Sequence, residues 1–154
     1  GATEVIGVDA SELGVEQARE NARLNGLEDK VSFVCADVFD FLPALEEKGE
    51  KFDVVILDPP AFTKSGSTVK NAIRGYKEIN LKAMKLLPRG GYLATCSCSH
   101  FMKEEYFVQM LKDAAKDASV SLRQIEARQQ APDHPVLWNV PETYYLKFYI
   151  FQVV

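Results

Sequence analysis

The sequence predicts an α/β fold, a doubly wound and mostly parallel sheet with an antiparallel pair of strands at one edge. Three observations lead to this prediction. Short apolar runs alternate with amphipathic helical segments along most of the 154 residues, as in parallel sheets. The last two strand-like runs follow each other without a helix between them, which is typical of antiparallel neighbours. No linker or internal repeat divides the chain, so we expect one domain.

Local signals place each element. Ser11 is suited to cap the helix that follows the first strand, and Gly26 to end it. The unbroken apolar run Val54–Leu57 predicts a fully buried strand, and the Pro-Arg-Gly-Gly sequence at 88–91 ends the longest helix. The predicted strands are 4–8, 31–35, 52–57, 92–96, 121–128 and 145–153, and the predicted helices are 11–25, 39–48, 69–87 and 103–118.

The composition is that of an ordinary globular domain, with 47% apolar and 26% charged residues. No apolar run approaches the roughly 20 residues of a membrane span. Three cysteines, an odd number, fit no disulfide framework, so we expect a reducing, cytoplasmic environment. Cys96 and Cys98 lack the spacing of zinc ligands and have no partner Cys/His pair, so we predict no metal site.

Charge is unevenly distributed along the chain. The net charge is −4, but residues 64–89 contain seven cations and one acid, a net charge of +6, so that the remainder sums to −10. Lysines on a helix face are usually only solvated. Cations beside a candidate site are also what a phosphate backbone requires, and for Lys64, Lys70 and Arg74 both interpretations stay open.

The most informative stretch is DVVILDPPAFTK, residues 53–64. Asp58 follows a strand directly, at the sheet edge where open α/β sheets bind their ligands. Pro59 and Pro60 make the following chain stiff and leave their carbonyls free to accept hydrogen bonds. An acid, free carbonyls, the ring of Phe62 and the cation of Lys64 suit a flat base that carries an amino group. The alternative is a strand followed by an ordinary Pro-rich turn.

Acids follow three of the predicted strands. Asp9, Asp37 and Asp58 occupy these positions, and in a parallel sheet such residues line one edge. An acid after the second strand of a nucleotide-binding fold commonly binds ribose hydroxyls. Asp9 and Asp37 could instead only cap the helices that follow them. For the three together we favour a ligand crevice.

Several motifs together resemble one enzyme family. The acids after successive strands, with Asp-Pro-Pro after the last of them, are similar to class I methyltransferases that depend on S-adenosylmethionine, and these have a Rossmann-like sheet. More narrowly, the chain resembles the bacterial PUA-containing 23S rRNA cytosine-5 methyltransferases. The segments that carry this resemblance are DPPAFTKSG, RGYKEINLKAMKLL, TCSCSH, DHPV and PETYYLK.

The resemblance implies roles for individual residues. Asp9 would bind the ribose of S-adenosylmethionine, Asp37 would contact its adenine region, and Asp58 would lie beside both the cofactor and the target base. Cys98 would be the nucleophile. RNA, in particular 23S rRNA, would be the partner. The candidate positions for substrate binding are Pro59, Pro60, Phe62, Lys64 and Arg74, and for Phe62 both stacking on a base and ordinary packing stay open.

The chemistry of cytosine methylation explains the need for a cysteine. C5 of cytosine is a poor nucleophile, and a thiolate that adds to C6 activates it. Cys98 lies at a strand end, where a substrate can reach it, although it could also be a small packing residue. Cys96 competes for the role, because side chains two residues apart on a strand share a face. Cys35, inside a predicted strand, is expected in the core, and Trp138 is expected to pack.

The resemblance also indicates what the chain lacks. A domain of this family starts with a strand and a Gly-rich turn, and no such turn precedes Asp9. We therefore expect a fragment, residues 1–154 of a catalytic domain without its first strand. It should bind S-adenosylmethionine poorly and expose a strand edge that favours self-association.

Two other functions stay in competition. An Asp-Pro-Pro loop also serves methylation of a base amino nitrogen, which needs no cysteine, although Phe62 comes one position later than the aromatic residue usual in that arrangement. A catalytically silent RNA-binding module is the other alternative. A NAD-dependent dehydrogenase is disfavoured because the GxGxxG motif is missing.

Overall fold

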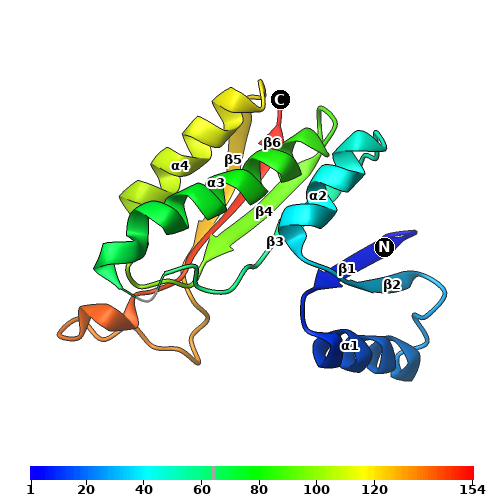
Figure 1. Ribbon diagram of the computed structural model, residues 1–154. Coiled ribbons are helices and arrows are strands. Elements are labelled where there is room, and N and C mark those ends of the chain that lie inside the picture. Colours follow the sequence, from blue (N-terminus) through cyan, green and yellow to red (C-terminus); the bar gives the residue numbers. More distant parts are fainter. Residues whose placement is uncertain (64) are drawn as a thin grey trace. The chain divides into compact units, whose positions relative to one another are not determined.

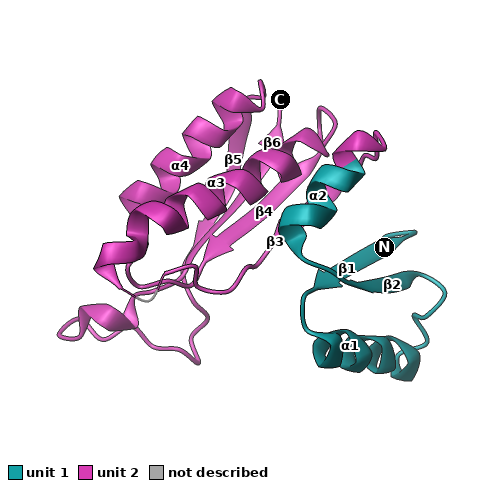
Figure 2. Cartoon of the chain, viewed as in Figure 1, with its two compact units in different colours: residues 1–45 teal, residues 46–154 magenta. Residues whose placement is uncertain are grey.

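The computed structural model describes residues 1–63 and 65–154 (Figure 1). These residues form two compact units, residues 1–45 and residues 46–154 (Figure 2). The strands belong to two separate sheets, one in each unit.

Unit 1 is a parallel β-α-β motif. Strand β1 (Val5–Asp9) leads into helix α1 (Glu12–Leu24), which returns to strand β2 (Val31–Cys35). Asp9 lies opposite Cys35 in the parallel ladder. The predicted caps are confirmed, since Ser11 Oγ accepts a hydrogen bond from the Gly14 amide and Gly26 has a φ of 62°. Helix α2 (Val38–Glu47) follows β2 and continues into unit 2.

Unit 2 contains a four-stranded sheet in the order β3-β4-β6-β5. Its strands are β3 (Val54–Leu57), β4 (Tyr92–Ser97), β5 (Leu122–Arg128) and β6 (Lys147–Val153). β3 and β4 are parallel, whereas β6 is antiparallel to both β4 and β5. The α/β fold with an antiparallel edge is thus confirmed, and β6 inserts between β4 and β5.

Two helices, α3 (Val69–Lys85) and α4 (Glu104–Asp117), lie side by side along the sheet of unit 2 (Figure 1). Their apolar residues recur at helical spacing and face the core, as an amphipathic pattern requires. Tyr76 of α3 and Phe107 of α4 are fully buried and meet edge to face, with ring centroids 5.8 Å apart. Short 3₁₀ turns, η1 (Gly66–Thr68) and η2 (Pro141–Thr143), precede α3 and β6.

Three burial predictions are wrong. β3 is an edge strand of its sheet rather than a fully buried one, and its residues Val54 and Ile56 are 53% and 70% exposed. Cys35 is exposed rather than in the core, because it closes β2 at the sheet end. Trp138 does not pack, since it lies on the loop between β5 and β6 and is 98% exposed.

In the part of the chain that the structure describes, no helix has the length and apolar character needed to cross a membrane.

Candidate active site

Two exposed carboxylates end the strands of unit 1. Asp9 closes β1, and its Oδ1 accepts a hydrogen bond of 2.7 Å from the Ser11 amide. Asp37 follows β2, and its Oδ1 accepts one of 2.8 Å from the Phe39 amide. The capping interpretation therefore holds for one oxygen of each residue. In each case the other oxygen has no hydrogen-bond partner among the described residues, so it remains available to a ligand.

Asp58 ends the corresponding strand of unit 2 and contacts a cysteine of the neighbouring strand. The Cys96 thiol donates a hydrogen bond of 3.0 Å to Asp58 Oδ1 and approaches the Leu57 carbonyl at 3.6 Å. Burial, followed by this hydrogen bond and the charge of Asp58, raises the pKa of the Cys96 thiol far above its usual range. Cys96 is therefore held as a neutral thiol, which is not the nucleophilic form.

Cys98 has a different environment. β4 ends at Ser97, so Cys98 lies in the turn that follows and is half-buried, whereas Cys96 lies within the strand and is 5% exposed. Both cysteines lie at or just after the end of β4, the strand that pairs with β3, so both are candidates, but their burial separates them. Cys98 is the accessible thiol of the two.

The turn that carries Cys98 is fastened on both sides. Ser97 Oγ donates to the Tyr76 hydroxyl at 3.0 Å, and Ser99 Oγ donates to the Thr63 carbonyl at 2.9 Å. Thr63 belongs to the loop that starts at Asp58, so the contact joins the loops after β3 and β4. The Phe62 ring lies on Tyr76, with centroids 4.6 Å apart. These contacts favour packing rather than base stacking for Phe62.

The structure adds a residue that was not among the predicted site residues. Lys147, the first residue of β6, is 4% exposed and pairs with Ser97 in the antiparallel ladder. Its Nζ donates to the carbonyls of Ser99 and Tyr145, each at 2.6 Å. Burial lowers the pKa of Lys147 to about 8, against the opposing influence of Cys98, Glu104 and Cys96. Its only sequence signal was its place at the end of PETYYLK.

Glu104, in the first turn of α4, holds two tyrosines of the C-terminal segment. It accepts hydrogen bonds from the hydroxyls of Tyr149 at 2.5 Å and Tyr144 at 3.0 Å. Burial, together with the adjacent Glu104 carboxylate, raises the pKa of both phenols. These contacts hold the chain on both sides of Lys147.

The remaining predicted substrate residues are dispersed around the loop. Pro59 is half-buried, whereas Pro60 and Arg74 are exposed. Lys64 lies outside the described residues. The basic stretch is less free than its charge suggested, because Lys77 pairs with Asp117. Two further cations of α3, Lys82 and Lys85, both bind Glu46.

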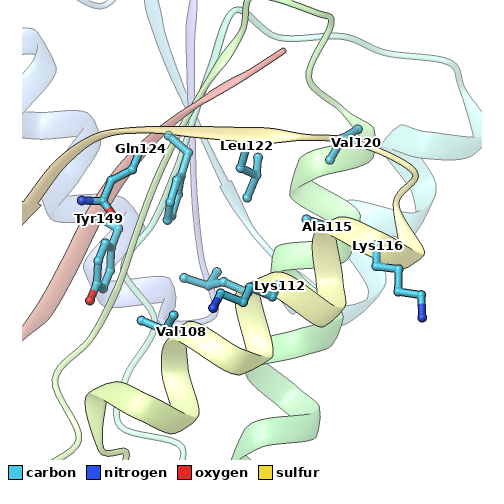
Figure 3. A pocket seen from close by; sticks show the side chains of 10 residues that line it. Val108, Lys112, Ala115, Lys116, Val120, Leu122, Gln124 and Tyr149 are labelled. Carbon is cyan, nitrogen blue, oxygen red and sulfur yellow. The ribbon is translucent and has the colours of Figure 1, made fainter.

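A separate cavity of about 440 Å³ lies between α4 and the strands β5 and β6 (Figure 3). Leu111, Leu122 and Phe151 give it an apolar lining, and Lys112 and Lys116 also border it. It includes none of the predicted site residues. The predicted site residues lie away from this cavity, most of them at strand ends and in the loops that follow.

The residues of unit 1 fit the predicted cofactor. A carboxylate that follows a parallel strand and keeps one free oxygen can accept hydrogen bonds from ribose hydroxyls. Asp9 and Asp37 both meet this requirement. The crevice predicted to include Asp58 as well involves both units and stays a prediction.

A family of known proteins matches most of this chain. The sequence pattern of the family described as "Methyltransferase domain" matches residues 1–142. The chain therefore belongs to this family, and the prediction of a methyltransferase domain is confirmed.

Individual relatives of known name are also similar to this chain. The chain is 47% identical over 148 residues to ribosomal RNA large subunit methyltransferase I of Aeromonas salmonicida (strain A449). The matched segment is 96% of this chain and 37% of that protein. The chain is 45% identical over 155 residues to the protein of the same name from Salmonella arizonae, with coverage of 100% and 38%. The chain thus spans less than two fifths of the length of these relatives.

Solved structures agree with the fold. SMU.776, a methyltransferase crystallised with SAH (S-adenosylhomocysteine), superimposes with a TM-score of 0.85 at 19% identity, over 99% of this chain and 40% of that one. At this identity the likeness concerns the fold. SAH is what remains of S-adenosylmethionine after it has donated its methyl group, so that structure contains the spent form of this donor.

Proposed function

We propose that this chain is the catalytic part of an S-adenosylmethionine-dependent methyltransferase that forms 5-methylcytosine in 23S rRNA, with Cys98 as the nucleophile and Asp58 as the residue that faces the base. The observation that carries the proposal is the contrast between two cysteines. Cys96 is buried and hydrogen-bonded to Asp58, whereas Cys98 is half-buried in a turn attached to the Asp58 loop.

The relatives support the substrate class. Those at 45–47% identity are named ribosomal RNA large subunit methyltransferase I. Their name does not specify the atom that is methylated. The choice of cytosine C5 rests on the cysteine beside the Asp-Pro-Pro loop, because methylation of an amino nitrogen or a hydroxyl needs no thiol.

The proposed chemistry starts at Cys98. Its thiolate forms a bond to C6 of cytosine, and the displaced electron pair reaches N3, which takes the proton that the Asp58 carboxyl group, protonated when the base is bound, shares with it. C5 would then be electron-rich and could form a bond to the donor's methyl carbon, while the bond from that carbon to the sulfonium sulfur breaks and its electron pair stays on the sulfur. After loss of the C5 proton to a base, the electron pair restores the C5–C6 double bond, the C6–S bond breaks and the N3 proton returns to Asp58.

The methyl donor would be held mainly by unit 1. When bound, S-adenosylmethionine supplies an electrophilic methyl group from its sulfonium centre. The free carboxylate oxygens of Asp9 and Asp37 would accept hydrogen bonds from its ribose and adenine ends.

We also propose that one more parallel strand pairs with β3 in the complete domain. β3 pairs with β4 alone among the described strands, and Val54 and Ile56 are exposed along it. An apolar, unpaired edge favours pairing with another strand, including one from a second copy. The three free cysteines accord with a cytoplasmic site of action.

Covalent trapping tests the function. The complete protein is incubated with S-adenosylmethionine and 23S rRNA transcripts that contain 5-fluorocytidine, whose fluorine blocks loss of the C5 substituent. We expect an RNA-linked band on a denaturing gel that persists in Cys96→Ala and disappears in Cys98→Ala. Loss in Cys96→Ala alone would move the nucleophile to Cys96.

Absence of a band separates the alternatives. If ordinary RNA is still methylated, the reaction is amino-nitrogen methylation, for which exposed Asp58 and the two prolines after it would suffice. If neither methyl transfer nor binding of S-adenosylmethionine is detected, the protein is an RNA-binding module without catalysis.

A further inference from the structure

The charge of Lys147 lacks a counter-ion. The side chain is 4% exposed, and its described hydrogen-bond acceptors are two neutral carbonyls, those of Ser99 and Tyr145. Among the residues that the structure describes, no carboxylate lies within ion-pair distance of its Nζ. Burying an ammonium group without a paired anion costs free energy, so we expect Lys147 to have a functional role.

The position of Lys147 relates it to Cys98. It lies opposite Ser97 in the ladder and binds the carbonyl of Ser99, so it contacts the residues on both sides of Cys98. Two carbonyls engage two of the three ammonium hydrogens. The third hydrogen has no described acceptor and is free for an anion that appears at the turn.

The charged and titratable groups around Lys147 come from three elements. Cys96 and Cys98 belong to β4 and the turn after it, and Glu104 comes from α4; all three act on the pKa of Lys147 in the direction of keeping it protonated. Glu104 is already engaged by the hydroxyls of Tyr144 and Tyr149, and Cys96 by Asp58. Cys98 is the group of this set that has no competing partner among the described contacts.

We propose that Lys147 is a positioning residue that holds the turn around Cys98 and serves as the counter-ion of the Cys98 thiolate. The pair is neutral when the thiolate forms, which removes the cost of the uncompensated ammonium group. The catalytic part of this role, the effect on the thiolate during the reaction, rests on the proposed function. The same cation would stabilise the thiolate both before it adds to C6 and when it departs.

Alkylation of the thiol by iodoacetamide measures this role without RNA or S-adenosylmethionine. The complete protein is alkylated at a series of pH values, and fragment-ion mass spectrometry separates Cys98 from Cys96. In Lys147→Met we expect alkylation of Cys98 at pH 7 to slow about tenfold and its pH midpoint to rise by about one unit. Lys147→Arg should stay within about threefold of the wild type, because it keeps the charge.

A matched control distinguishes this effect from a general loss of positive charge. Lys103→Met removes an exposed cation just before α4 and should leave the pH midpoint unchanged. A purely structural role of Lys147 would alter the rate by the same factor at every pH. An unmoved midpoint in Lys147→Met would therefore overturn the proposal.

A reciprocal measurement applies even if Lys147→Met does not fold. Two interacting sites must influence each other equally, so removing the thiol must change the titration of the lysine. By NMR of the Lys147 Cε, the titration midpoint should fall in Cys98→Ala, and an unchanged midpoint would refute the counter-ion role.

The outcomes for the two proposals are separable. If the midpoint of Cys98 alkylation rises as expected in Lys147→Met but no RNA is trapped, the proposed function is wrong and the pairing of Lys147 with Cys98 stands. If RNA is trapped but the midpoint of Cys98 alkylation does not move in Lys147→Met, the proposed function stands and the pairing of Lys147 with Cys98 is wrong.

Discussion

The strand ends of unit 1 and those of unit 2 carry similar side chains but satisfy them in different ways. In unit 1, Asp9 binds the amide of Ser11 and Asp37 that of Phe39, each two residues further along the chain. In unit 2, Asp58 is bound by Cys96, and Ser99 binds both Thr63 and Lys147. These partners are 36 to 48 residues apart in sequence.

The comparison indicates which parts of the site are held rigidly and which are not. A local cap fixes one oxygen of a carboxylate and leaves the other available, which suits a residue that binds an exchangeable cofactor. A network of long-range contacts fixes a whole turn, which suits residues that must hold reacting atoms within a fraction of an ångström. The following predictions test this contrast, in order of decreasing expected effect.

Asp58→Asn should cause the largest loss, because it removes the proton that the long-range site is proposed to deliver. We expect methyl transfer by the complete protein to fall by about 10²–10⁴-fold, with the affinity for RNA changed little. Single-turnover transfer of labelled methyl groups measures this effect. Asp53→Asn, at the opposite end of the same strand, is the matched control, and an equal loss there would contradict the role of Asp58.

The stability of the Lys147 site should depend on pH. Burial lowers the pKa of Lys147 from 10.5 to about 8, so between these values the unfolded chain binds more protons than the folded chain. The contribution of Lys147 to the free energy of unfolding must then rise with pH across this window. We expect the difference between the wild type and Lys147→Met to shift by up to about 3 kcal/mol in favour of the wild type.

Urea unfolding of both proteins at pH 7 and at pH 10 measures this shift. Tyr149 also titrates on unfolding, but both variants contain it and Lys147 does not act on its pKa, so its contribution cancels in the difference. A difference that is flat or that falls with pH would show that Lys147 is not held as a desolvated ammonium group.

Asp9→Asn should affect the locally capped site, and the effect should be on binding. The amide can still serve the cap but offers the ribose a weaker, neutral acceptor, and hydrogen bonds to charged groups contribute about 1.5–3 kcal/mol. We expect the KM for S-adenosylmethionine to rise about 10- to 100-fold with kcat nearly unchanged. Asp29→Asn, an exposed acid of unit 1, is the control, and a fall in kcat with constant KM would refute the assignment.

The smallest effect is expected on the basic face of α3. Arg74 is exposed, whereas Lys82 is engaged by Glu46 at 2.6 Å. Arg74→Ala should weaken RNA binding severalfold and reduce the slope of log affinity against log salt by about one. Lys82→Ala should leave that slope unchanged. Equal slopes for the two variants would indicate that the charge of α3 does not meet the RNA backbone.

Local patterns predicted the elements closely. β2 was expected at 31–35 and is observed there, and α1 has its expected caps at both ends, because caps and alternation depend on neighbours in sequence. Exposure was predicted less well. The apolar run of β3 was expected to be buried, yet Val54 and Ile56 are exposed, because burial depends on which strands lie alongside and a strand's own residues do not encode this.

The candidate site divides in the same way. Asp9, Asp37 and Asp58 were identified from their positions at strand ends and Cys98 from the family resemblance, and their chemical assignments remain predictions. Lys147 was missed because an isolated lysine at the start of a strand has no distinguishing pattern. The contacts that single it out come from Ser99 and from its own neighbour Tyr145.

The sequence by itself determined the class of the protein, the order of its elements and the acids and cysteines available for chemistry, because these follow from periodicity, caps and short motifs. Only the tertiary structure decided which cysteine is tied to Asp58 and which is accessible, and that a buried lysine binds the turn beside it. The physical reason is that burial and pairing are set by antiparallel and parallel registers between distant strands, here β4 with β3 and β6.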